Sequence, residues 1–438
     1  MKESKIKELI TKLNKAAGNL NTVIRVTKKY RLQLDNKQKN IIQNWIIECR
    51  NLYNKCVDKH NTNNKYFNKG YKAIKSSLFN EIYGETKKPV PYDVLTDEVR
   101  AFCSNLNGSY TNKKNGNITH FTMKHKSAKN KSYSLLIPYK SINKNGFFIT
   151  LLGVINKLEL NELPIHDCRL YYDHKFDTYT LSIPTDVKCK TIANREDIVA
   201  IDPGEKNFIY FHGLTSYGYI GKDIRIQLLQ LRNKISRLQK ILSNNKNRNK
   251  KKLRNKKHLN KKINKYYKKI KNIVKELHNQ SANYLCKNYD KILIPKFETQ
   301  KMISHKKSSY KEYKKDYINE GQTAEDKKQR ARELTKKTRL NKNVKFVLNS
   351  LSHYKFREHL TEKAAEYGCE LKVVTEEYTS CTCCQCGHMS KKYKNRIKEC
   401  ENCGHKIDRD LNGARNILIK NLSVFNYEAI KPMVTCKP

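Results

Sequence analysis

Residues 198–212 read IVAIDPGEKNFIYFH, and the interpretation of the fold begins from this stretch. The apolar run Ile198–Ile201 is typical of a strand buried on both faces, and Asp202-Pro203-Gly204 then predicts a tight turn. A second strand is expected over Phe208–His212. A buried fold has no structural use for a carboxylate at a strand end, so Asp202 is a candidate functional residue.

Further acids occur in the same context later in the chain. The runs Ile292–Pro295 and Leu371–Val374 predict two more buried strands, and Glu298 follows the first of them. Asp408 and Asp410 lie in DRDLNGARNIL, which continues as a helix. Each acid taken alone is as well explained as a cap or turn residue.

Carboxylates brought together repel one another, and divalent cations offset that repulsion. Two Mg²⁺ ions about 3.5–4 Å apart are the usual arrangement for phosphodiester hydrolysis. The residues therefore predict a two-metal site built from Asp202, Glu298 and one of Asp408 and Asp410.

The 14 cysteines are clustered in a way that predicts metal ligation. Cys383-x-x-Cys386 and Cys400-x-x-Cys403 form two knuckles, each followed by Gly-His, and two such turns make a four-thiolate zinc site. No ligand position looks open, so we expect one structural Zn²⁺. Cys381-x-x-Cys384 is also a CxxC pair and remains an alternative first knuckle.

The charge of the chain points to a polyanionic partner. Its 438 residues contain 90 Lys+Arg and 41 Asp+Glu, a formal net charge of +49, which makes nucleic acid the first partner to consider. Codon bias towards Lys and Asn is the competing explanation. No apolar run approaches a membrane span and no apolar secretion signal precedes the first strand, so neither a membrane nor secretion is expected.

The excess charge is densest in two predicted helices. Apolar residues recur every three or four positions over 224–242 and 259–277, which predicts an antiparallel helical hairpin. Residues 222–271 contain 20 Lys/Arg and one acid, a pattern expected of a phosphate-tracking surface rather than of an ordinary solvated helix. The candidate nucleic-acid-binding residues are Lys251, Lys252, Arg254, Lys256, Lys257, Lys261 and Lys262.

The N-terminal half predicts a different kind of module. A basic helix is expected over 1–20, a strand over Thr22–Leu34, and a helix capped by Asp35. Residues 35–125 are mostly helical in pattern. The β-rich runs Tyr133–Tyr139, Gly146–Leu152 and Thr178–Pro184 then predict a barrel-like module that carries the helices as an insertion, and 305–340 is expected to be a mobile lid or loop.

Three motifs together resemble a known family. AIDPGEKNF, ILIPKFETQKM and YTSCTCCQCGH…CENCGHKIDRDLNGARNIL are similar to the three split RuvC motifs and the zinc ribbon of the TnpB/Fanzor family of transposon-encoded RNA-guided DNA endonucleases. The resemblance covers about residues 195–422, and the N-terminal half fits by architecture alone. Asn412-Gly413-Ala414 is closer to the eukaryotic and viral Fanzor branch than to bacterial TnpB, whereas the doubled first cysteine knuckle departs from the family pattern.

The resemblance implies an α/β RNase H-like (RuvC) nuclease domain with an inserted zinc ribbon, preceded by a wedge β-barrel with a helical recognition insertion. It implies that Asp202, Glu298 and Asp410 hold two catalytic Mg²⁺, with Asp408 as second choice, and that Asn412 and Arg415 lie beside them. The implied domains are 1–34 (first helix and strand), 35–128 (recognition), 129–194 (wedge), 195–377 (RuvC, with the basic hairpin 223–288), 378–407 (zinc ribbon), 408–425 (last RuvC segment) and 426–438 (tail).

The expected activity is guided cutting of double-stranded DNA beside a short adjacent motif, by a monomeric protein bound to a guide RNA. The expected compartment is the nucleus for a Fanzor-type protein and the cytoplasm for a bacterial one. Two alternatives remain at this point: an RNase H-fold transposase that joins DNA ends, and an RNA-guided DNA-binding regulator without catalysis.

Overall fold

The computed structural model describes residues 23–62, 71–72, 74–76, 90–128, 132–156, 158, 160, 162–190, 192–244, 250–303, 340–390 and 396–425. The helix expected over 1–20, and the lid expected over 305–340 except for its last residue, lie outside these residues. The chain divides into two compact units, residues 25–187 and the residues from Lys188 onward together with the N-terminal end.

The unit 25–187 contains a four-stranded sheet and two long helices. The sheet has the strand order β1-β6-β5-β2, and α2 (Asn36–Thr62) packs against α4 (Tyr92–Lys114). The four strands are β1 (Val23–Leu32), β2 (Ser132–Ile137), β5 (Cys168–Asp173) and β6 (Thr178–Lys188). The predicted cap is confirmed as a capping box, since Asp35 Oδ1 accepts from the Gln38 N–H at 2.8 Å and Gln38 Oε1 accepts from the Asp35 N–H at 3.1 Å.

Two features of this unit differ from the sequence-based expectation. The predicted strand Gly146–Leu152 is a strand only over β4 (Gly146–Phe147) and then becomes the helical turn α5 (Ile149–Leu152). Phe148 adopts a left-handed φ of 46°, which ends the strand and turns the chain. The four-stranded sheet has β1 and β2 at its two edges, so the described strands form an open sheet rather than a closed barrel.

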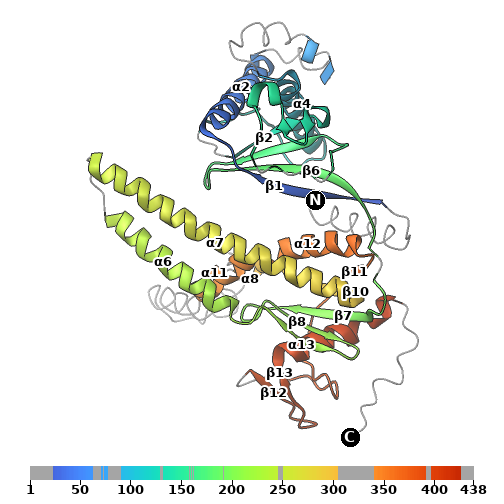
Figure 1. Cartoon of the computed structure of the whole chain (residues 1–438). Helices are drawn as coiled ribbons and strands as arrows, with labels where there is room; N and C mark the ends of the chain where they lie inside the picture. The colour runs from blue at the N-terminus through green and yellow to red at the C-terminus, as the bar shows by residue number, and fades with distance from the viewer. Residues whose placement is uncertain are drawn as a thin grey trace. The chain divides into compact units, whose positions relative to one another are not determined.

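The second unit contains a mixed five-stranded sheet of order β11-β10-β7-β8-β9, with helices on both faces (Figure 1). The central strand β7 pairs parallel with β10, which pairs parallel with β11, whereas β8 and β9 follow as antiparallel strands. This layout confirms the α/β class of the domain. The strand bounds are β7 (Glu196–Pro203), β8 (Ile209–Gly213), β9 (Tyr217–Ile220), β10 (Tyr289–Pro295) and β11 (Glu370–Val374).

Alternating side chains of β7 divide between two cores. Val199 and Ile201 pack in the larger core beneath α7 (Lys250–Asn288) and α12 (His353–Glu366). Ile198 and Ala200 point to the opposite face and pack against α13 (Arg409–Asn421). A strand buried on both faces explains why the sequence run is continuously apolar.

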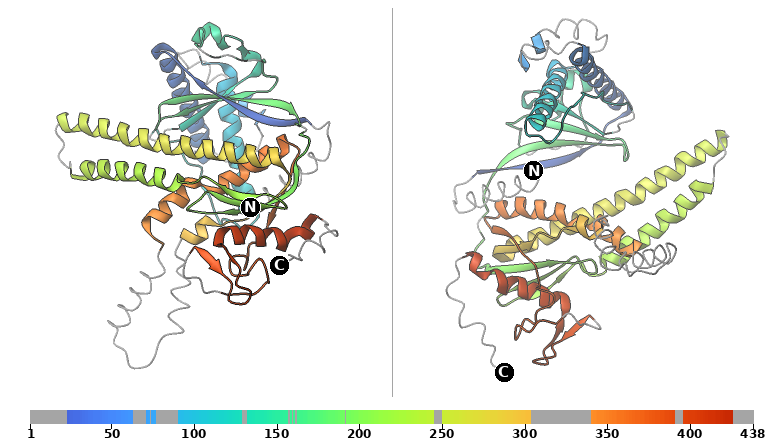
Figure 2. Two further views of the ribbon diagram at one scale, coloured as in Figure 1. Left: turned by 60° about the horizontal axis from the view of Figure 1, so that its bottom comes forward. Right: turned by 180° about the vertical axis from the view of Figure 1, so that it is seen from behind.

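The predicted helical hairpin is confirmed as α6 (Ile224–Asn244) and α7, which lie side by side and extend beyond the sheet (Figure 2). Buried apolar residues line their shared seam, as the spacing predicted: Ile224, Leu228, Leu231, Ile235, Ile263 and Ile270. Two shorter described helices of the unit are α8 (Thr299–Ile303) and α11 (Lys342–Leu351). Within the described residues, none of the helices has the length and apolarity to cross a membrane.

Candidate active site and zinc ribbon

Three acids lie at or just after the carboxyl ends of the three parallel strands. Asp202 is the penultimate residue of β7, Glu298 comes three residues after β10, and Glu376 comes two residues after β11. Because these strands are parallel neighbours, their carboxyl ends meet at one edge of the sheet. Glu376 was not singled out from the sequence, although its place after the LKVV strand repeats that of Glu298 after ILIP.

The charges at this edge act on one another. The pKa of Asp202 is raised to about 8, first by burial and then by the negative charges of Asp410 and Glu376, while Arg409 opposes the rise. The pKa of Glu376 is also raised, by burial and then by Glu298. The four carboxylates therefore form an electrostatically linked row, and a cation would relieve the repulsion along it.

The carboxylates are nevertheless spread out. Among the described residues, the only group of three or more Cys, His, Asp or Glu side chains whose ligand atoms all lie within 4.8 Å of one another is a set of four cysteines. Carboxylate oxygens are the donors that Mg²⁺ prefers, so the donor chemistry of the row fits this ion. Among the described residues, the structure thus brings Asp410 and Glu376 each into electrostatic range of Asp202 without gathering three carboxylates into a compact cluster.

Helix α13 approaches Asp202 through a glycine. A Cβ added at Gly413 would overlap with Oδ2 of Asp202, so a larger residue would displace either the carboxylate or the helix. Gly413 is buried and lies in the middle of α13, where glycine costs about 0.5–1 kcal/mol relative to alanine. We conclude that close approach to Asp202 outweighs helix propensity at this position.

The two Asp candidates of the last motif have different surroundings. Asp408 is the N-cap of α13, where Oδ1 accepts from the N–H groups of Asp410 and Leu411, and its Oδ2 lies 2.8 Å from Arg396 Nε. Asp410, in the first turn, is the one whose charge acts on Asp202. Asp410 lies 3.4 Å from the guanidinium of Arg409. Of the two, Asp410 is therefore the acid that interacts with Asp202, whereas Asp408 caps the helix.

Helix α12 holds the loops that carry Asp202 and Glu298. His353 Nε2 lies 3.0 Å from the carbonyl oxygen of Gly204, in the turn after Asp202, and its ring packs edge-on to Phe297 at 4.8 Å. Arg357 donates to the carbonyl of Lys296 at 2.6 Å. Burial lowers the pKa of His353 to about 3, so the ring is neutral at pH 7, with Nε2–H as the donor to Gly204.

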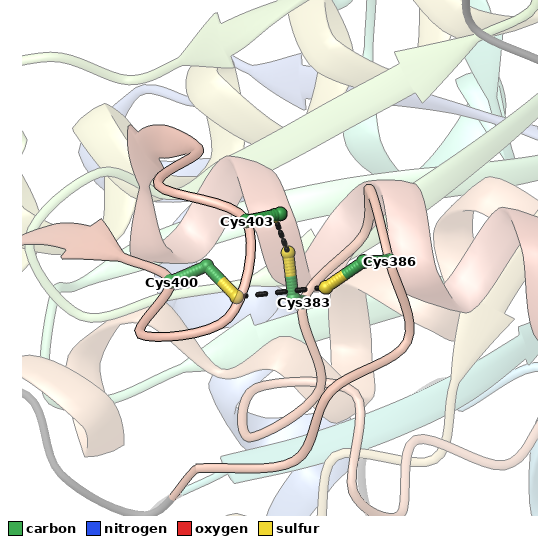
Figure 3. A group of neighbouring side chains, drawn as sticks. All are labelled: Cys383, Cys386, Cys400 and Cys403. Atoms are coloured by element: carbon green, nitrogen blue, oxygen red, sulfur yellow. Dashed lines mark hydrogen bonds between the residues drawn. The ribbon is translucent and has the colours of Figure 1, made fainter.

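The four predicted zinc ligands lie together, as Figure 3 shows. The sulfurs of Cys383 and Cys403 are 3.8 Å apart, and those of Cys386 and Cys400 are 3.6 Å apart. Tetrahedral zinc with Zn–S bonds of about 2.3 Å separates its sulfurs by about 3.8 Å, so the four thiols fit Zn²⁺. A backbone hydrogen bond at His388 is the main cause that lowers the pKa of Cys386.

The alternative pair Cys381 and Cys384 is not part of this group. Cys384 Sγ faces α13 and the second knuckle instead, 3.9 Å from Arg415 Nη1 and 3.8 Å from His405 Nε2. Its backbone N–H donates to Asn412 Oδ1 at 3.0 Å. Among the described thiols, those of 383, 386, 400 and 403 are the set close enough to share one ion.

Two asparagines of α13 clamp the first knuckle to the helix. The side-chain amides of Asn412 and Asn416 both donate to the carbonyls of Thr379 and Thr382, at 2.8–3.3 Å. Asn412 is fully buried. Because the same helix carries Asp410, the four-cysteine group and the acid row share one support.

The basic hairpin presents lysines to solvent. Lys256, Lys257, Lys261 and Lys262 are exposed on α7. Residues 251, 252 and 254 belong to the same helix, and their side chains lie outside the described part of the structure. The exposed lysines suit contact with a phosphate backbone, which positions a nucleic acid without reading its sequence.

Comparisons with known proteins agree with these motifs. The model of the Cas12f1-like TNB domain family matches residues 353–417, from α12 through the zinc ribbon to α13. The TnpB-like protein L770 of Acanthamoeba polyphaga mimivirus is 24% identical over 408 residues, covering 90% of this chain and 72% of the relative. The protein A625R of Paramecium bursaria Chlorella virus 1, named as a transposase, is 26% identical and covers 91% of this chain and 87% of its own length.

A shorter stretch of the chain is similar in sequence to a protein named as a nuclease. The CRISPR-associated endodeoxyribonuclease Cas12f1 of Sulfoacidibacillus thermotolerans is 31% identical over 86 residues, or 19% of this chain and 20% of the relative. The two viral relatives match along nearly the whole chain, so their similarity is not confined to the zinc ribbon.

Proposed function

Because this chain is a TnpB-family protein, we propose that it is an RNA-guided DNA endonuclease that cuts double-stranded DNA through a RuvC-type site. The observation that carries the proposal is the row of carboxylates at the carboxyl edge of the parallel strands, in which burial and like charges raise the pKa of Asp202 to about 8. Burying an acid beside other acids destabilises the fold, so such an arrangement indicates a functional role, here the binding of a cation for a reaction.

Asp202, Glu298 and Asp410 are the proposed ligands of two Mg²⁺ ions, with Glu376 beside them. Mg²⁺ held by these residues would supply Lewis-acid chemistry, which lowers the pKa of a water and offsets negative charge on a leaving oxygen. The chain itself orients the ligands: His353 holds the turn after Asp202, Arg357 holds the loop before Glu298, and Asp408 caps the helix that carries Asp410. The four cysteines are proposed to bind one structural Zn²⁺.

The proposed partners are a guide RNA and the target double-stranded DNA, held by a monomeric protein. Base pairing with the guide would select the target, while the protein would read a short adjacent motif and the backbone. The seven basic residues of the hairpin, Lys251, Lys252, Arg254, Lys256, Lys257, Lys261 and Lys262, are proposed phosphate contacts. The viral relatives and the Asn412-Gly413-Ala414 sequence support the Fanzor branch, and with it a nuclear location.

The main alternative is a strand-transfer transposase, since one viral relative is named as a transposase. The two functions differ in their products. A guided nuclease cuts wherever the guide pairs and leaves free ends, whereas a transposase joins a defined DNA end to a target. A regulator without catalysis would bind guided targets and leave them uncut.

The test begins with the RNA that copurifies with the protein, which is sequenced and used to design a matched DNA. We expect cutting of the matched DNA in Mg²⁺ and no cutting of a mismatched one. Asp202→Asn should lower the rate by more than the roughly 10- to 100-fold typical of residues behind metal ligands. Asp197→Asn is the matched control, because Asp197 lies on the same strand at its other end and pairs with Lys291 on the surface.

Joined DNA ends in place of free ones would favour the transposase. Uncut matched DNA, with the same result for wild type and Asp202→Asn, would refute the nuclease.

A further inference from the structure

The face of the sheet that carries Asp202 also carries a row of aromatic side chains. In the strand register, Asp202 on β7 lies opposite Tyr210 on β8, which lies opposite Tyr219 on β9. In the neighbouring row, His212 on β8 lies opposite Tyr217 on β9. Directly opposed residues of paired strands project from the same face. The four aromatic residues therefore extend from Asp202 to the edge strand of the sheet.

The inner two rings are fixed and the outer two are open. Tyr210 is buried, and its hydroxyl accepts a hydrogen bond from the Asn207 side-chain amide at 2.6 Å. Its ring centroid lies 5.7 Å from that of Tyr219, and the His212 and Tyr217 rings stack at 5.8 Å with 21° between their planes. Tyr217 and Tyr219 are 66% and 48% exposed. Single exposed tyrosines are common on protein surfaces, but two exposed rings that extend a row of inner aromatic rings indicate a binding surface.

Cationic groups flank the row. The guanidinium of Arg396 lies 5.7 Å from the Tyr210 ring centroid. Arg415 on α13 acts on His212, whose pKa is lowered mainly by burial and further by this arginine, so the ring is neutral and uncharged rings face the outer tyrosines. Arg396 is also paired with Asp408, so the arginines leave neutral aromatic faces beside basic side chains, a surface that suits a ligand with π-faces and a negative backbone.

We propose that Tyr210, His212, Tyr217 and Tyr219 form an aromatic platform, in which the exposed rings of Tyr217 and Tyr219 stack the unpaired bases of the DNA strand that enters the Asp202 edge and the inner two rings support them. In a duplex the base faces are already stacked on one another, so rings in this position favour a single strand. Strands lie about 4.8 Å apart, which places Tyr219 roughly 10 Å from Asp202 and within reach of nucleotides next to the bond that is cut. The inference rests on the proposed nuclease function and adds how its substrate strand is held.

The test replaces the two outer rings, because they are exposed and their loss should not disturb the fold. Binding of a fluorescein-labelled oligothymidylate to the full chain is measured by anisotropy without Mg²⁺, so that no cleavage occurs. The double variant Tyr217→Ala/Tyr219→Ala should weaken binding by about 5-fold or more, because it loses at least one stacked base and each stacked base contributes about 1 kcal/mol or more. Tyr217→Phe/Tyr219→Phe keeps the π-faces and should bind within about 2-fold of wild type.

A second readout reports stacking itself. An oligonucleotide with one 2-aminopurine loses fluorescence when that base stacks, and we expect quenching by wild type and the Phe variant but not by the Ala variant. Tyr171→Ala is the matched control, since Tyr171 is a 46% exposed strand tyrosine of the other unit. A thermal melt of each variant checks that the fold is retained.

The outcomes of these experiments distinguish failure of the platform proposal from failure of the nuclease proposal. Equal affinity and equal quenching for the Ala variant and wild type would overturn the platform, whether or not the wild type cuts guided DNA. Failure of the wild type to cut matched DNA in Mg²⁺ would instead refute the nuclease on which the platform's role depends. Support for both requires slower guided cutting by the Ala variant through a raised KM, with recovery in the Phe variant.

Discussion

The contact between Gly413 and Asp202 predicts an unusual mutant, in which a substitution that favours the helix abolishes activity. In a helix interior, replacing glycine with alanine usually raises the free energy of unfolding by about 0.5–1 kcal/mol. Here the added methyl group overlaps with the Asp202 carboxylate, and overpacking of this kind costs about 1–3 kcal/mol. The net loss of stability for Gly413→Ala is therefore at most about 2.5 kcal/mol, and the protein should remain folded.

The effect on catalysis should be much larger. To restore ordinary contact, the carboxylate or α13 must move by about 1 Å, and a misplacement of that size can cost about 100-fold in rate. Single-turnover cutting of matched DNA by the guide-loaded protein measures this rate, while a thermal melt and the zinc content measure the fold. We expect a rate loss of about 100-fold with zinc content unchanged.

Gly108→Ala provides the matched control. Gly108 is an exposed glycine of α4, and a Cβ there meets nothing within 4 Å. This substitution should raise stability by about 0.5–1 kcal/mol, as helix propensity alone requires. A Gly413→Ala protein that cuts within about 3-fold of wild type would refute the argument that close approach of α13 sets the position of Asp202.

Three further measurements address the zinc ribbon, the basic hairpin and the buried histidines. Cys400→Ser should lose the bound zinc, together with the cutting activity that depends on α13, whereas Cys381→Ser should keep about one zinc per chain by elemental analysis. Target binding should weaken as salt is added, with a slope of magnitude about 5 or more in a plot of log binding constant against log salt concentration. Changing the exposed lysines of α7 to glutamine should reduce that magnitude by about 0.9 for each phosphate contact that is lost. A flat salt dependence would show that the positive charge of the chain does not contribute to target binding. Burial lowers the pKa of His278 to about 4 and that of His353 to about 3, so between pH 6.5 and those values the unfolded chain binds protons that the folded chain does not. The contribution of the two histidines to stability should be constant above pH 6.5 and fall as the pH drops, by up to about 1.4 kcal/mol per pH unit for each histidine. The raised pKa of Asp202 acts in the opposite direction up to about pH 8, so the histidines are measured in an Asp202→Asn background, in which urea midpoints that stay constant from pH 7 to 5 would contradict this.

The sequence was most informative where one local rule decides the structure. The β7 strand, the helical seam and the Asp35 cap follow from apolar spacing and capping chemistry, and all three are confirmed. The grouping of four thiols also follows, because a CxxC turn fixes its own geometry. Such features depend on residues that are neighbours in the chain.

The remainder depends on contacts between distant segments. Glu376 has no motif of its own and becomes notable only because β11 lies beside β10. The strand predicted at Gly146 fails because Phe148 adopts a left-handed conformation that its residue type does not favour. The aromatic platform was equally hidden, since its rows exist only in the register of β7, β8 and β9.

The distance in sequence between β7 and α13 has a consequence for how the protein is made. Helix α13 packs on β7, yet about 200 residues separate Asp202 from Asp410, and at 5–20 residues per second a ribosome takes roughly 10–40 s to synthesise them. During that interval the nascent chain has its first acid but lacks its last. A partly synthesised or truncated chain therefore lacks the complete acid row, which would keep cutting activity restricted to fully synthesised protein.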